Sequence, residues 1–136
     1  MQTAMTRELF WLTSTVTLTA LFWVPYILNR LNEHGAWPAL RNPQPDLRPK
    51  AQWAERMMRA HANAVENLVI FAPLVFALHA TGISTPATAG ACMVYFFARL
   101  AHYIIYTLGL PLLRALAFAV GFAAQMVQAL TLFGNI

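Results

Sequence analysis

Long apolar runs dominate this sequence and decide what it can fold into. The first run, residues 9–28, contains no charged residue. A helix of about 20 mostly apolar residues crosses the hydrocarbon core of a bilayer. Four runs meet or approach that length, and they cover residues 9–28, 53–80, 87–108 and 111–133. The pattern predicts an all-α, integral membrane four-helix bundle with up-down-up-down topology, forming one domain over residues 1–136.

The composition argues against a soluble fold. Hydrophobic residues make up 59% of the chain and charged residues only 10%, whereas ordinary globular domains carry roughly 25% charged residues. A small soluble protein needs more charge than this to cover its surface. The lipid bilayer is therefore expected to be part of the solvent.

The net charge of +4 arises from basic residues that lie within and beside the apolar runs. A basic balance can indicate nucleic acid or an anionic membrane surface. The placement favours membrane topology together with an anionic ligand, and no nucleic-acid partner is expected. The single cysteine, Cys92, excludes an internal disulfide and a cysteine-based metal site, and no metal site is expected.

The basic residues also predict an orientation. The long polar loop over residues 29–52 contains several arginines and Lys50, and Arg114 follows the third helix on the same side. The opposite side has Arg7 alone. Because cytoplasmic loops carry the excess of Lys and Arg, the loop should face the cytoplasm and both termini should lie outside.

The second helix carries a polar stripe at membrane depth. Arg59, Asn63 and Glu66 are separated by offsets of four and seven, which place them on one helix face. Ionisable groups inside a bilayer cost about 2.5–3.5 kcal/mol each on insertion scales, so they persist when they pair, reach the interface or carry out a function.

The third helix carries a matching stripe of Arg99, His102 and Tyr106, and Arg114 opens the fourth helix at the same level. All these groups are expected to converge at one depth below the cytoplasmic surface. Because arginines outnumber acids there, the predicted pocket is positive and suits a carboxylate or thiolate.

Two structural interpretations stay open beside the functional one. Arg59–Glu66 or Arg99–Glu66 could be interhelical ion pairs that fix helix register. Arg56, Arg114 and Glu55 could extend to the membrane interface without further function.

Beyond these stripes, the sequence resembles the MAPEG family, the membrane-associated proteins in eicosanoid and glutathione metabolism, and its opening segment is similar to bacterial members. The resemblance covers the whole chain in helix order and loop length. It rests on "ERMMRAHANAVEN" in the second helix and "FFARLAHYIIYTLGLPLLR" across the third and fourth. The matching residues are Arg59, Ala60, Asn63, Glu66, Arg99, Ala101, His102, Tyr106, Pro111 and Arg114.

The resemblance implies a homotrimer in a bacterial inner membrane, with glutathione as co-substrate between neighbouring subunits. Arg114 would be the catalytic residue, because a cation beside a thiol stabilises its thiolate. The expected glutathione-binding residues are Arg30, Arg59, Asn63, Glu66, Arg99, His102 and Tyr106. The thiolate would attack a lipophilic electrophile or reduce a peroxide arriving from the bilayer.

The fourth helix departs from part of the family. Some members have a Ser directly after the arginine of this helix and a Tyr one turn later, where this sequence has Ala115 and Phe118. The departure argues against chemistry of the prostaglandin-synthase type. The prediction is a glutathione-dependent transferase or peroxidase, and the alternative is a non-catalytic membrane protein of the same fold with a lipid-binding or assembly role. A channel or transporter is disfavoured by a single internal acid and no broken helix.

Overall fold

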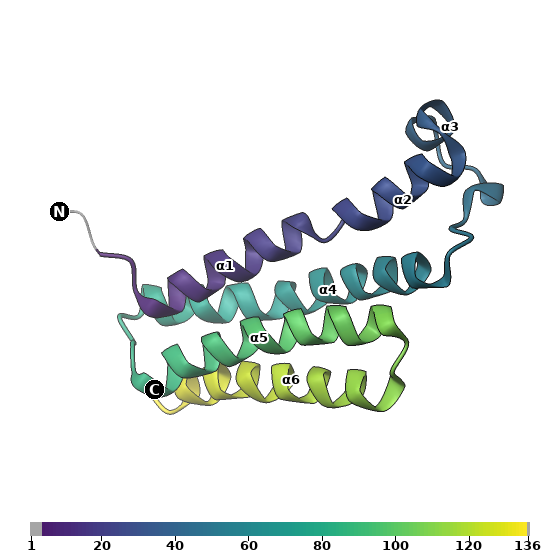
Figure 1. The fold of residues 1–136 in the computed structure, drawn as a ribbon. Coiled ribbons are helices and arrows are strands. Elements are labelled where there is room, and N and C mark those ends of the chain that lie inside the picture. Colours follow the sequence, from purple (N-terminus) through teal and green to yellow (C-terminus); the bar gives the residue numbers. More distant parts are fainter. Residues whose placement is uncertain (1–3, 136) are drawn as a thin grey trace.

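The computed structural model of the protein describes residues 4–135, and within that range it is helical without strands. Four rods run side by side in alternating directions, as Figure 1 shows, with the start of α1 and the end of α6 at the same end of the bundle. Each rod is long and apolar enough to cross a membrane. The predicted all-α membrane four-helix bundle is therefore confirmed. The elements are α1 (Arg7–Leu21), α2 (Val24–His34), α3 (Ala36–Leu40), η1 (Pro45–Leu47), α4 (Gln52–Ala80), α5 (Pro86–Leu108) and α6 (Pro111–Phe133).

The first rod is broken into α1 and α2 just before Pro25. Proline has no backbone N–H and its ring clashes with the preceding turn, so the helix cannot continue through it undisturbed. A side chain of α5 stabilises the break, because the Tyr103 hydroxyl donates a hydrogen bond to the Phe22 carbonyl oxygen at 2.8 Å. The two rings also stack, with centroids 3.8 Å apart. The break is thus a packed, fixed feature of the bundle.

The first rod continues to His34, so the expectation that the loop begins at residue 29 is wrong. Residues 29–34 are polar but compatible with a helix, and the Asn29 side chain donates to Glu33 one turn later at 3.0 Å. The helix ends at Gly35, whose φ of 78° is readily adopted by glycine. Part of the expected loop is therefore helical, since α3 and η1 also lie within residues 29–52.

The turns between the last three helices follow from local chemistry. Thr85 and Thr88 form a capping box at the start of α5, with Pro86 at the first position. Gly109 ends α5 in the left-handed conformation, and Pro111 starts α6 directly afterwards. In the core between the helices, the rings of Phe71 and Tyr95 stack at 3.7 Å.

The other end of the bundle holds a buried acid that the sequence reasoning passed over. Glu8, in the first turn of α1, is 2% exposed, and its carboxylate accepts hydrogen bonds from the hydroxyls of Ser84 and Thr88. Gln128 lies close by and donates to the Thr88 carbonyl at 3.0 Å. This second polar cluster lies near the turn between α4 and α5, at the opposite end of the bundle from the α5–α6 turn that precedes Arg114 (Figure 1).

Candidate functional site: an arginine-lined hollow

A hollow of about 470 Å³ opens where α4 begins and α5 turns into α6. Four of its lining side chains are arginines and one is an acid, so the hollow is positive on balance. It is lined by Arg48, Pro49, Gln52, Glu55, Arg56, Arg59, Tyr106 and Arg114. Guanidinium groups bind carboxylates through two parallel hydrogen bonds and so give such a hollow a preference for organic anions.

Arg114 lies on the first turn of α6 and is held over the ring of Tyr106, with its guanidinium carbon 4.3 Å from the ring centroid. This cation–π contact fixes the direction of the charge without neutralising it. Arg114 therefore remains a full cation that borders the hollow.

Arg56 connects α4 to the turn that carries Arg114. Its Nε donates to the Thr107 carbonyl at 2.9 Å, near the end of α5. A Cβ on Gly109 would lie 3.2 Å from the Arg56 guanidinium, and the φ of 78° at this residue is one that glycine adopts readily. Arg56 thereby links the first turns of α4 to the end of α5.

Arg59 and Glu66 lie on the outside of the single subunit. Arg59 pairs with Glu55 one turn earlier at 3.1 Å, and its side chain is 67% exposed. The Glu66 side chain is also exposed. In residues 4–135 the structure contains neither the Arg59–Glu66 pair, whose members both lie on α4, nor the interhelical Arg99–Glu66 pair.

Arg99 is buried between the helices and anchors a polar network next to the hollow. Its Nη2 donates to Asn63 Oδ1 at 2.7 Å and lies 3.4 Å from His102 Nδ1. Because a guanidinium can only donate, the histidine nitrogen facing it acts as an acceptor. Asn63 also receives bonds from Asn67, whose own carbonyl accepts from Gln125 of α6. The network thus links α4, α5 and α6.

The network reaches the hollow through aromatic contacts. The His102 ring meets the Tyr106 ring edge to face, with centroids 5.5 Å apart, and lies 6.4 Å from the ring of Phe118. The Tyr106 ring in turn contacts the Arg114 guanidinium. The stripe on α5 therefore forms a continuous path from the buried arginine to the hollow.

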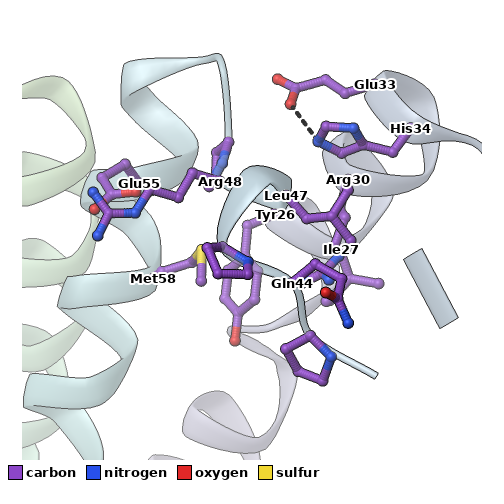
Figure 2. A pocket seen from close by; sticks show the side chains of 13 residues that line it. Tyr26, Ile27, Arg30, Glu33, His34, Gln44, Leu47, Arg48, Glu55 and Met58 are labelled. Carbon is purple, nitrogen blue, oxygen red and sulfur yellow. Dashed lines mark ion pairs between the residues drawn. The ribbon is translucent and has the colours of Figure 1, made fainter. Parts of the chain in front are cut away.

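Arg30 is the one expected site residue that lines a different cavity. Figure 2 shows it near the end of α2, in a second hollow of about 460 Å³ between α2, the segment 43–49 and the start of α4. Three residues, Arg48, Pro49 and Glu55, line both hollows. Within one subunit, three of the expected site residues line the same cavity: Arg59, Tyr106 and Arg114. The adjoining buried network contains Asn63, Arg99 and His102. Arg30 and Glu66 belong to neither group.

Sequence reasoning did not assign Arg48 or Gln52 to the site, although both line the arginine-rich hollow. Arg48 follows η1 in a proline-rich segment whose path no helical period describes. The available signal was its place among basic residues close to the start of α4, which is a weak indication of position.

Comparison with known proteins gives one family. The sequence profile of the MAPEG family matches residues 9–134 of this chain. A search of curated proteins found no match. The matched range includes every residue of the two hollows and of the buried network.

Proposed function

Since the chain belongs to the MAPEG family, a family of membrane proteins associated with glutathione, we propose that it is a glutathione-dependent transferase or peroxidase acting on lipophilic compounds. The observation that carries the proposal is the arginine-lined hollow. Four guanidinium groups against one carboxylate suit a ligand with two carboxylates and an ionisable thiol. The residues present therefore fit glutathione as co-substrate.

The arginines have separate roles in this proposal. Arg59 projects at the rim, where its charge can bind a carboxylate of the tripeptide in exchange for its pair with Glu55. Glu66 would bind the α-amino group. Arg114 stabilises the thiolate, because a fixed cation lowers the pKa of a neighbouring thiol from about 8.5. When bound, glutathione supplies the nucleophilic sulfur that attacks the lipophilic electrophile or the peroxide oxygen.

The buried network positions these groups. The bond between Arg99 and Asn63 fixes the register of α5 against α4. His102, which faces Arg99, packs against the Tyr106 ring and helps to hold it in place. Preorganised charges stabilise an anion without reorganising during the reaction. The network would also contact the ligand from the floor of the site.

A homotrimer fits the exposed site residues. Glu66 and Arg59 lie on the outside of the subunit, and charged side chains at membrane depth normally face protein or a water-filled cavity. A neighbouring copy covering this face would bring its own Arg30 toward the site. The proposed location is the bacterial inner membrane, with residues 29–52 cytoplasmic and both termini outside.

The test measures binding and turnover separately on detergent-solubilised protein. Glutathione affinity is measured by calorimetry, and turnover by transfer to an aryl halide. Arg59→Ala and Glu66→Ala should each weaken binding by about 30-fold, the effect of losing one charged hydrogen bond. Arg114→Ala should reduce kcat by about 100-fold with a smaller effect on binding.

Arg41→Ala is the matched control, since Arg41 is an exposed loop arginine that lines neither hollow. It should bind and react like the wild type. Absence of binding at millimolar glutathione would refute the proposal. Binding without turnover toward both electrophiles and peroxides would favour the non-catalytic alternative, for which the replacement of hydroxyl residues by Ala115 and Phe118 is the specific observation.

A further inference from the structure

We propose that Asn67, one turn after Asn63 on α4, is a positioning residue for the glutathione site. Its side chain fixes the orientation of the Asn63 amide, so that Asn63 meets the ligand only as a hydrogen-bond donor. This role rests on the proposed function and deepens it, because Asn67 lies outside the set of expected site residues. The hydrogen bonds around one amide oxygen point to it.

Two donors from different helices meet at the side-chain oxygen of Asn63. Arg99 Nη2, from α5, donates to Asn63 Oδ1 at 2.7 Å, and Asn67 Nδ2, from α4, donates to the same atom at 3.3 Å. A guanidinium contains only donors, so the Asn63 amide must turn its oxygen toward Arg99. Asn67 Nδ2 also donates to the Asn63 backbone carbonyl at 2.9 Å, so the amide nitrogen of Asn67 must face Asn63. The orientations of both amides are thus determined by their partners.

The second donor supplies what Arg99 alone does not. An amide held by one hydrogen bond can still pivot about its oxygen. A carbonyl oxygen accepts through two lone pairs that lie near the plane of its amide, so two donors on one oxygen also define that plane. With both lone pairs of Asn63 Oδ1 occupied, its Nδ2 group is directed away from Arg99 and Asn67.

This orientation determines which ligand group Asn63 can bind. Asn63 is partly exposed, and Arg59 and Glu66 are exposed on either side of it along the same stripe. An amide whose oxygen is occupied offers only N–H groups, so its partner must be an acceptor such as a carboxylate or a peptide carbonyl. An ammonium group finds no acceptor on Asn63 and binds Glu66 instead. Asn67 therefore keeps the recognition of the anionic and cationic groups of the ligand on separate residues.

The side chain of Asn67 can be changed without breaking the link between α4 and α6. Asn67 is only 9% exposed, so it acts through Asn63 from within the subunit. The link to α6 uses the backbone, because Gln125 Nε2 donates to the Asn67 carbonyl at 3.2 Å. A substitution of Asn67 therefore removes the donors to Asn63 and leaves this backbone acceptor in place.

The experiment is a double-mutant cycle on the full chain in detergent, with glutathione affinity measured by calorimetry. Asn67→Leu removes the donor at similar volume and should raise the Kd about fivefold, while Asn63→Ala should raise it about tenfold. The double variant should bind like Asn63→Ala, because Asn67 acts only through Asn63. The kcat of Asn67→Leu at saturating glutathione should stay at the wild-type value, since Arg114 is unchanged.

Gln128→Leu is the matched control for loss of a buried amide. Gln128 Nε2 donates to the carbonyl of Thr88, near the start of α5 and so at the opposite end of the bundle. This variant should lower the thermal midpoint, as Asn67→Leu does, but keep wild-type glutathione affinity. A general loss of stability therefore does not produce the expected result.

The outcomes separate this role from the proposed function. Absence of glutathione binding by the wild type refutes both. If the wild type binds, an unchanged Kd in Asn67→Leu, or a further fivefold loss when it is added to Asn63→Ala, would overturn the positioning role and leave the enzymatic proposal standing.

A second variant serves the same cycle if Asn67→Leu does not fold. Asn67→Ser keeps a hydroxyl that can donate to the Asn63 carbonyl, as Thr81 donates to Ala77 at the end of this helix. Because this shorter side chain does not reach Asn63 Oδ1, it should weaken binding as Asn67→Leu does. Wild-type affinity in Asn67→Ser would count equally against the positioning role.

Discussion

At the scale of single residues, the arginines near one end of the bundle are held in place by different kinds of contact. Arg99 is buried and bonded to a neutral amide, Arg114 lies on an aromatic face, and Arg59 pairs with an acid on its own helix. The first two arrangements hold a guanidinium in place while preserving its charge. Such groups remain able to stabilise an anion that approaches them, which is what a thiolate site requires.

The contact between Arg114 and Tyr106 gives a prediction for ligand affinity. Tyr106→Leu removes the aromatic face, so Arg114 loses its fixed direction and the Kd for glutathione should rise about threefold. Tyr106→Phe keeps the face and should bind within experimental error of the wild type. Calorimetry on both variants checks this. Equal weakening in the two variants would show that the hydroxyl, and not the ring, is what matters.

The amide of Asn63 gives a prediction for stability. Asn63→Leu leaves the buried Arg99 without its closest acceptor, and the cost should be about 2 kcal/mol, the worth of a hydrogen bond to a charged group. A lower thermal midpoint in detergent would report the loss. Ala62→Leu, at the exposed neighbouring position, is the control and should leave the midpoint unchanged. An unchanged midpoint in Asn63→Leu would mean that Arg99 finds another acceptor.

At the scale of elements, several boundaries are set by side chains from elsewhere in the fold. The start of α4 has no side-chain cap of its own. The backbone N–H groups of Lys50 and Ala51, directly before this helix, donate to the carboxylate of Glu33 at the end of α2. Glu33 thereby connects the end of the loop, at Lys50 and Ala51, to α2, and it forms part of the wall of the second hollow.

Removing this contact should loosen the loop. Glu33→Ala leaves the backbone N–H groups of Lys50 and Ala51 without their acceptor, and limited proteolysis should cut within residues 41–50 faster than in the wild type. Asn32→Ala changes the exposed neighbouring residue and should be cut at the wild-type rate. Cleavage rates that match in all three proteins would show that the loop is held by other contacts.

The same contact explains what could be predicted from sequence. The four spans and the stripe from Arg99 to Tyr106 follow from apolar length and helical period, which are local properties. The path of residues 41–50 depends on a bond between Glu33 and backbone groups 17 and 18 residues away. The position of Arg48 at both hollows depends on that path. Local periodicity contains no information about this path. The burial of Glu8 against the turn at Ser84 could not be predicted for the same reason, since it also depends on residues far apart in the sequence.

At the scale of the whole molecule, much of the outer surface is apolar. Large side chains along α6, including Leu112, Leu116 and Phe122, are about half exposed or more. Lipid covers such a surface in a membrane protein. The exposed charges of Arg59 and Glu66 interrupt this pattern on α4, and they favour protein over lipid as the neighbour of that face.

The expected neighbour is a second copy of the chain. Light scattering coupled to size exclusion in detergent should give a protein mass three times that of the 15.2 kDa chain. Glu66→Leu removes a charge from the proposed contact face and should keep the trimer mass while weakening glutathione binding, as Glu66→Ala should. A monomeric mass for active wild-type protein would rule out the shared site.

Arg48, Pro49 and Glu55 form a common wall between the two cavities. An occupant of either cavity that draws Arg48 toward itself weakens the field available to the other. Thermodynamic coupling of this kind is reciprocal, so a ligand in either cavity would change the affinity of the other cavity by the same factor in both directions. One arginine on a shared partition would then make the two cavities report on each other's occupancy.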